Sequence, residues 1–263
     1  MLKLENISAG YGKKTILHNI SLSFQPGQIY TILGKNGCGK STLLKTCADM
    51  LSPTQGQILL QEKALTEYPP LERARLISYL AQHRNTPNIT VERLLTHGRH
   101  PHMSNLKQMC KEDWDVIDQV MEMMDIQGFR HHLLSSLSGG ERQRVYLAML
   151  LAQDTPILLL DEPTTYMDIE YQLSFLEMLK KLKAENKTIL MVLHDINHAL
   201  RISDQIILMD QGQIVSCGTP QETIDAKKLQ QVFQIAIQAY GKENASFFHI
   251  DLLKPTNNGP AEH

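Results

Sequence analysis

The sequence lacks long apolar runs and a strong charge of either sign. No stretch approaches the ~18 consecutive apolar residues that a membrane-spanning helix needs, and the start, MLKLENISAGYGKK, has no basic segment followed by an apolar core. We therefore expect a cytoplasmic chain. The 26 Lys and Arg residues against 28 Asp and Glu give a formal net charge of -2, so no basic field favours non-specific binding of nucleic acid.

Cysteines are few and dispersed. The four form no C-x-x-C pair, which is typical of a reducing compartment and argues against a zinc ribbon. We interpret all of them as packing residues: Cys38, Cys47, Cys110 and Cys217. With 263 residues, the chain is long enough to bury a substantial core without such staples, as one large domain or a domain with a subdomain.

Apolar strands alternate with amphipathic helices along most of the chain. This order implies crossover connections and a mainly parallel sheet, hence an α/β fold. The uninterrupted apolar run Ile157 to Leu160 is typical of a strand buried on both faces. Further strands are expected at 29–33, 57–61, 76–80, 188–193, 205–209 and 213–216, helices at 42–51, 72–75, 171–184 and 197–203, and an N-terminal hairpin at 2–7 and 15–24.

One internal region is predicted to be purely helical. Between His83 and Gln153 no strand signal is convincing, and helices are expected at 91–97, 112–124 and 139–153. We therefore predict one domain over 1–220, with an N-terminal antiparallel β subdomain and a helical subdomain inserted at about 83–155. Residues 221–263 are expected to form a C-terminal extension with a short helix and extended residues, ending in a disordered tail at 254–263.

A phosphate-binding loop follows the strand at 29–33. Gly34, four intervening residues and then Gly39-Lys40-Ser41 fit the spacing in which backbone N–H groups cradle phosphates. Lys40 is expected to reach the β- and γ-phosphates and Ser41 to ligate Mg²⁺. The predicted nucleotide-contacting residues of this loop are Gly34, Asn36, Gly37, Cys38, Gly39, Lys40, Ser41 and Thr42.

Two adjacent carboxylates close the strand at 157–160. Ligands of open α/β sheets bind at the carboxyl ends of strands, where Asp161 fits the role of holding Mg²⁺ through a water molecule. Glu162 fits that of polarising the water that attacks the γ-phosphate. Taken alone, an Asp-Glu strand end is equally consistent with a simple exit into a loop.

A second glycine-containing helix start lies at Leu137-Ser138-Gly139-Gly140-Glu141-Arg142-Gln143. One nucleotide does not need two such loops from one subunit. The sequence therefore suggests that Ser138, Gly139, Gly140 and Glu141 grip the γ-phosphate of a nucleotide held by another subunit. A plain Ser-capped helix is the alternative.

Taken together, these motifs resemble the ATP-binding subunit of an ATP-binding-cassette (ABC) transporter, with a P-loop NTPase (RecA-like) core. The resemblance covers Tyr11 to about Pro220 and implies that two cassettes pair head to tail around ATP and Mg²⁺. By the same resemblance Tyr11 stacks on adenine and Gln82 senses Mg²⁺ and the attacking water. His194 then contacts the γ-phosphate, and Asp168, in Thr165-Tyr166-Met167-Asp168, belongs to a loop that crosses the dimer interface.

The resemblance also implies partners. A separate integral membrane permease would dock a cytoplasmic helix in a groove lined by residues 83–91 and parts of 97–110, placing the chain on the inner face of the membrane. The stretches 72–82 and 98–102 are similar to cassettes of importers for iron chelates, haem and cobalamin, which work with an extracytoplasmic substrate-binding protein. An exporter ATPase with separate membrane subunits and a soluble non-transport cassette ATPase remain alternatives. We interpret His97, His100 and His102 as surface or permease-facing residues and expect no metal there.

Overall fold

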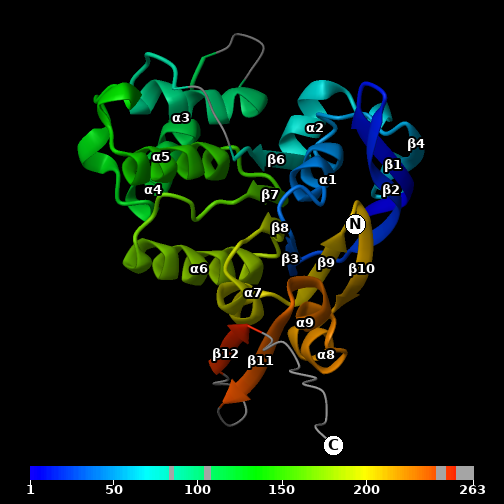
Figure 1. Ribbon diagram of the computed structural model, residues 1–263. Coiled ribbons are helices and arrows are strands. Elements are labelled where there is room, and N and C mark those ends of the chain that lie inside the picture. The colour runs from blue at the N-terminus through cyan, green and yellow to red at the C-terminus, as the bar shows by residue number, and fades with distance from the viewer. Residues whose placement is uncertain (83–85, 104–107, 241–246, 253–263) are drawn as a thin grey trace, which may run out of the picture.

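The computed structural model describes residues 1–82, 86–103, 108–240 and 247–252, and shows a central sheet flanked by two different layers (Figure 1). The six-stranded central sheet has the order β10-β9-β3-β8-β7-β6. Its strands are β3 (Ile29–Gly34), β6 (Ile77–Leu80), β7 (Ile157–Asp161), β8 (Thr188–Val192), β9 (Gln205–Asp210) and β10 (Gln213–Gly218). All neighbouring pairs are parallel except β9 and β10, as expected for an α/β core.

Successive residues of the central strands pack into two separate hydrophobic cores, because side chains along a strand point alternately to the two faces of the sheet. Ile32, Leu159 and Leu190 pack in one cluster with α1 (Lys40–Cys47) and the N-terminal strands. Leu33, Leu160 and Met191 pack in the other cluster with α5 (Gly139–Ala152), α6 (Ile169–Ala184) and α7 (Ile196–Ile202). The apolar runs seen in the sequence are therefore strands buried on both faces.

The N-terminal strands form their own antiparallel sheet, in the order β2-β1-β4-β5. These strands are β1 (Leu2–Tyr11), β2 (Lys14–Phe24), β4 (Gln55–Leu60) and β5 (Lys63–Ala64). The inward-facing residues of β1, Leu2, Leu4 and Ile7, are at most 1% exposed. Figure 1 shows this sheet in blue, on the side of the molecule opposite the green helices.

The inserted helical region lies in the sequence between β6 and β7 and contains α3 (Val91–Arg99), α4 (Lys111–Met123) and α5. They are preceded by α2 (Pro70–Leu76). The described part of the chain also contains four short 3-10 turns, at Leu65–Glu67, His100–His102, Gln127–Phe129 and Leu134–Ser136. Arg75 Nε donates to the carbonyl oxygen of Pro101 at 2.7 Å, and Gln153 Nε2 donates to that of Ala74 at 2.6 Å. The insertion is thus joined to the core by hydrogen bonds. The predicted α/β class, N-terminal antiparallel subdomain and inserted helical subdomain are confirmed.

The C-terminal region contains more regular structure than the sequence indicated. Its described residues form the helices α8 (Pro220–Asp225) and α9 (Lys228–Phe233) and an antiparallel pair of strands, β11 (Ile235–Tyr240) with β12 (Phe247–Leu252). Leu229 and Val232 of α9 are buried against the core. The tail predicted at 254–263 lies outside the described residues. Among the described residues, no helix is both long and apolar enough to cross a membrane.

Two local expectations were wrong. The helix after the phosphate loop ends at Cys47 rather than near Leu51, because Asp49 adopts a left-handed conformation (φ 55°) and Met50 N–H returns to the carbonyl oxygen of Lys45 at 2.9 Å. Cys38 and Cys47 are buried as predicted, but Cys110 and Cys217 are exposed and are not packing residues.

Candidate functional site

The phosphate loop connects β3 to the first residue of α1. Gly39 immediately precedes the helix with φ 108°, a backbone conformation that residues with a side chain rarely adopt. A Cβ atom on Gly34 would lie 2.4 Å from the carbonyl oxygen of Met209, so the loop also needs glycine where it passes β9. The Lys40 ammonium donates to the carbonyl oxygens of Gly34 at 2.7 Å and Lys35 at 3.1 Å. These bonds fix the cation inside the loop.

A cavity of about 360 Å³ opens over this loop and gathers residues that are distant in the sequence. The end of β1, the loop, the residue two positions after β6 and the ends of β7 and β8 all contribute. The lining residues are Tyr11, Ile16, Asn36, Gly37, Gly39, Lys40, Ser41, Thr42, Gln82, Glu162 and His194. Apart from Ile16, all of these are residues that the sequence singled out.

Asp161 sits beneath the cavity, with an exposed fraction of 1%. Ser41 Oγ donates to its Oδ1 at 3.0 Å, and the Tyr79 hydroxyl donates to its Oδ2 at 3.4 Å. Burial raises the pKa of Asp161, while the hydrogen bond from Ser41 opposes this shift. A buried carboxylate beside a hydroxyl is a set of hard oxygen donors whose negative charge lacks solvation, which suits Mg²⁺.

Glu162 and His194 form a contact at the mouth of the cavity. His194 Nε2 lies 2.5 Å from Glu162 Oε1, and the side chains are 52% and 10% exposed, respectively. Glu162 also has a left-handed backbone (φ 53°), a costly conformation for this residue type that is typical of functional positions. The carboxylate is therefore held at a defined place next to the phosphate loop.

Tyr11 contributes an aromatic surface from the end of β1. Its side chain is 49% exposed, and Lys45 Nζ of α1 lies 5.9 Å from the ring centroid. Tyr79 and Lys45 are contacts that the sequence analysis missed. Tyr79 had one usable signal, since it lies three residues before Gln82 on the strand next to β7, whereas Lys45 had none beyond its place in α1.

The segment Leu137–Gln143 is not part of this cavity. Ser138 Oγ accepts a hydrogen bond from the backbone N–H of Glu141 at 3.3 Å, and Glu141 Oε2 accepts one from that of Ser138 at 2.7 Å. This reciprocal capping starts α5, and the bond from Ser138 lowers the pKa of Glu141. Among the described residues, none from this segment lines the cavity over the phosphate loop.

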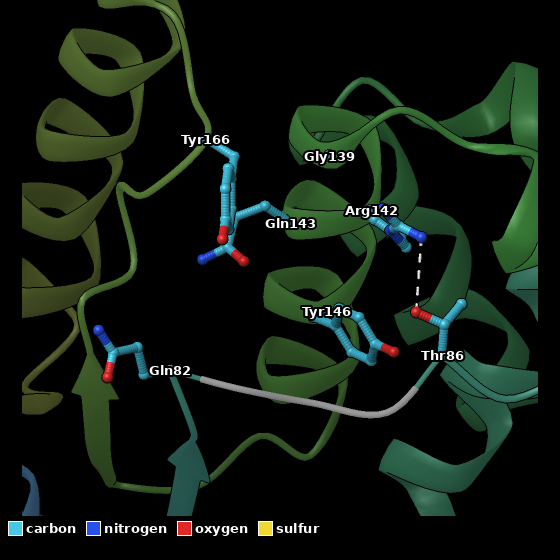
Figure 2. Close-up of a pocket in the computed structure, with 7 residues that line it drawn as sticks. All are labelled: Gln82, Thr86, Gly139, Arg142, Gln143, Tyr146 and Tyr166. Carbon is cyan, nitrogen blue, oxygen red and sulfur yellow. Dashed lines mark hydrogen bonds between the residues drawn. The ribbon is translucent and has the colours of Figure 1, made fainter.

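Instead, the segment borders a second cavity, also of about 360 Å³ (Figure 2). Gln82 belongs to both cavities and so lies between the phosphate loop and α5. Gln143 Nε2 donates to the carbonyl oxygen of Pro163 at 2.6 Å. The second cavity is lined by Gln82, Thr86, Gly139, Arg142, Gln143, Tyr146 and Tyr166.

Asp168 lies in neither cavity and begins α6. Its Oδ1 accepts a hydrogen bond from the backbone N–H of Tyr171 at 3.0 Å. Nearby in the chain, Tyr166 and Ile169 are 72% and 73% exposed, whereas the intervening Met167 is buried. The structure therefore divides the predicted residues into two groups. One surrounds the phosphate loop, whereas Ser138–Glu141 and Asp168 lie outside that cavity, at the starts of α5 and α6.

Among the described residues, no group of three or more His, Cys, Asp or Glu side chains could hold a metal ion, and this includes the histidines at 97–102. His102 Nε2 lies 2.8 Å from the carbonyl oxygen of Gln153, which ties the turn after α3 to the end of α5, while His97 and His100 are exposed. Both line a cavity of about 480 Å³ together with Thr96, Pro101, Met103, Met109 and Gln153. Residues 83–85 and 104–107, which belong to the predicted permease groove, lie outside the described residues.

Comparisons with known proteins agree on one family. Residues 17–165 match the family model described as ABC transporter. The ferric enterobactin transport ATP-binding protein FepC of Escherichia coli is 39% identical over 88% of this chain and 86% of its own. The iron(3+)-hydroxamate import ATP-binding protein FhuC of Bacillus subtilis is 40% identical, over 89% of this chain and 88% of its own length. The dimeric MJ0796 ABC transporter cassette superimposes with a TM-score of 0.75 at 28% identity, covering 84% of this chain and 99% of that one.

Proposed function

Because the chain belongs to the ABC transporter family and is its ATP-binding ATPase component, we propose that two copies close around ATP and thereby power a separate membrane permease. The predicted family, fold and enzyme class are confirmed by these relatives. The dimer, the permease and the transported substrate belong to the proposal.

The separation of the two glycine-containing segments carries this proposal. Lys40 and Ser41 line the cavity over the phosphate loop, whereas Gly139 borders a different cavity in the same chain. The amides at the start of α5 point to an anion site, and ATP on the phosphate loop of the same chain does not use it. In the proposed assembly a second copy placed head to tail supplies the missing half, and the existence of a dimeric structure of the MJ0796 cassette supports a pairing of two cassettes.

The polar and aromatic residues around the first cavity then have defined tasks. Tyr11 stacks on the adenine, and the loop amides with Lys40 hold the phosphates. Ser41 and Asp161 hold Mg²⁺, which when bound offsets the charge of the β- and γ-phosphates. Glu162 accepts the proton of the attacking water, with Gln82 beside it. His194 contacts the γ-phosphate, so its present bond to Glu162 is exchanged for a bond to the nucleotide.

We further propose that the permease imports an iron–siderophore or a related metal chelate. FepC and FhuC are named for ferric enterobactin and iron(3+)-hydroxamate, and the hemin import ATP-binding protein HmuV of Pseudomonas aeruginosa is 35% identical over 90% of this chain. The cavity beside His97 and His100 offers a docking place for a cytoplasmic helix of the permease. The chain then acts at the inner face of the membrane, and an extracytoplasmic protein delivers the substrate.

Mixing two inactive variants tests the shared site. A Lys40→Ala subunit has no working phosphate loop, and a Ser138→Arg subunit has no working second segment. In a mixed dimer, Lys40 of one copy faces Ser138 of the other in one complete site, so the mixture is expected to recover ATPase activity that neither variant shows alone. A mixture as inactive as its components would contradict the proposal, and so would full activity of a wild-type monomer.

Uptake of labelled ferric chelates tests the substrate class. Cells that lack this subunit are expected to lose uptake of one ferric chelate and to regain it with the wild-type chain but not with Lys40→Ala. Unchanged uptake of every ferric siderophore and of haem would contradict the assignment to import of such chelates.

A further inference from the structure

We propose that Arg144 and Tyr171 form a positioning joint that holds the Leu137–Gln143 segment and the Asp168 loop together as one unit. This inference rests on the proposed function, in which both elements reach the ATP of the partner copy. It adds two residues that touch neither nucleotide nor metal ion. Their role is to keep the two elements in a fixed relative position, so that both reach the partner's ATP at the same time.

Arg144 lies on α5, six residues after Ser138, and is only 8% exposed. Its Nη1 donates to the carbonyl oxygens of Asp125 at 2.8 Å and Met124 at 3.3 Å. Both carbonyls lie just after the end of α4, where Ile126 N–H donates to the carbonyl oxygen of Met121 at 3.0 Å and Asp125 N–H donates to that of Glu122 at 3.0 Å. The carbonyl oxygens of Met124 and Asp125 accept their hydrogen bonds from the Arg144 guanidinium, and its positive charge interacts favourably with the negative end of the helix dipole.

Tyr171 provides the other half of the joint from the first turn of α6. The guanidinium carbon of Arg144 lies 4.2 Å from the centroid of the Tyr171 ring. The Tyr171 hydroxyl donates to Asp125 Oδ2 at 3.2 Å, the same carboxylate oxygen that Arg144 Nη1 approaches at 3.4 Å. Arg144 is buried, and a cation–π contact is stronger at a buried site than at an exposed one, whereas the Asp125 side chain that accepts the outer hydrogen bonds is 78% exposed.

The same tyrosine is fixed to the Asp168 loop through its backbone. Tyr171 N–H donates to Asp168 Oδ1, so Asp168 caps the helix whose third residue stacks on Arg144. Two further contacts join the same elements upstream. Gln143 binds the carbonyl oxygen of Pro163, and a Cβ atom on Gly140 would lie 3.0 Å from the carbonyl oxygen of Tyr166. A displacement of α5 is therefore passed to the Asp168 loop.

The mixed dimer described above tests this joint without background activity. In its one complete site, the Lys40→Ala subunit contributes both Ser138 and Asp168, whereas the corresponding elements of the Ser138→Arg subunit face the inactive site. Tyr171→Leu removes the stacked ring and is introduced into one subunit or the other. Tyr171→Phe keeps the ring, and Tyr68→Leu removes a comparable tyrosine, which lies 4.7 Å from Lys63 Nζ in the N-terminal region.

We expect Tyr171→Leu to lower the recovered ATPase activity about five- to tenfold in the Lys40→Ala subunit and less than twofold in the Ser138→Arg subunit. Tyr171→Phe should retain most activity, and Tyr68→Leu should show no dependence on placement. Binding of a fluorescent ATP analogue to the isolated Tyr171→Leu chain should stay within twofold of wild type, because the phosphate loop is untouched.

Equal losses in both placements would overturn the inference, since they would indicate a general structural role. Unchanged activity in both placements would overturn it as well, and so would a matching loss of nucleotide affinity in the isolated chain. Failure of the proposed function is distinguishable, because the parent mixture of Lys40→Ala and Ser138→Arg would then recover no activity at all, and both proposals would fall together.

Discussion

Replacing Asp161 by asparagine is expected to stabilise the free protein while removing its Mg²⁺-dependent function. The Asp161 carboxylate is 1% exposed, and burial raises its pKa despite the hydrogen bonds from Ser41 and Tyr79. The ionised form is therefore more costly in the folded chain than in the unfolded one. Asparagine has almost the same shape, carries no charge and keeps both hydroxyls as partners, because a hydroxyl can also accept.

The expected magnitude is modest. Single stabilising substitutions commonly add about 0.5–2 kcal/mol, so we take about 1 kcal/mol for Asp161→Asn. For a chain of this length, that free energy corresponds to a rise in Tm of about 2–4 °C. Addition of Mg²⁺ and ATP should then raise the Tm of the wild type but barely that of the variant, which reverses their order.

The pH dependence follows from the sign of the pKa shift. Because the folded pKa of Asp161 lies above the unfolded one, the unfolded chain ionises first and ionisation favours unfolding. The loss of stability caused by the buried Asp161 charge is absent below the unfolded pKa and complete above the folded pKa. The Tm advantage of Asp161→Asn without Mg²⁺ should therefore be largest at neutral pH and disappear below about pH 4.

Asp113→Asn is the matched control for this measurement. Asp113 is also buried, and burial alone would raise its pKa, but hydrogen bonds from Cys110 and Arg99 outweigh burial and lower the pKa. Its neutralisation leaves Arg99 buried without its charged partner, so we expect a loss of about 3 kcal/mol. Thermal melts in EDTA measure both variants. A lower Tm for Asp161→Asn in EDTA would refute the reasoning on its buried charge.

Two further predictions concern packing. Gly98→Ala places a Cβ atom 2.4 Å from the carbonyl oxygen of Met149, so α3 and α5 become overpacked. This cost should exceed the ~1 kcal/mol gain in helix propensity, and denaturant titrations should show a free energy of unfolding about 1–2 kcal/mol lower. Gly128→Ala is the control, because its Cβ atom meets no atom within 4 Å and should change the stability little. Thiol titration should detect exposed Cys110 and Cys217 in the native chain, but not Cys47, whose pKa burial raises to about 12; rapid labelling of Cys47 before unfolding would contradict its burial.

The sequence predicted the parts of the site that depend on local order. Strand, glycine loop and helix are consecutive in the chain, so the positions of Lys40 and Ser41 followed from spacing alone. Asp161, Glu162 and His194 come at or just after the ends of neighbouring parallel strands, and that topology brings them to one edge of the sheet.

Contacts between distant elements were not predictable in the same way. The bond from Tyr79 to Asp161 depends on the register of β6 against β7, and the stacking of Arg144 on Tyr171 depends on how two helices pack. The end of α1 was missed because Asp49, an ordinary residue in the sequence pattern, adopts a left-handed conformation. The pairing of β11 with β12 likewise depends on partner choice rather than composition.

The most direct test of the central claim is the mass of the Glu162→Gln variant in the presence of ATP. Without the carboxylate that accepts the proton of the attacking water, hydrolysis should stop while binding persists, so the closed pair should accumulate. Light scattering should then show about twice the 29.8 kDa of one chain with ATP and a single chain without it. A variant that stays monomeric at saturating ATP, or that hydrolyses ATP at the wild-type rate, would contradict a site completed by a second copy around Glu162.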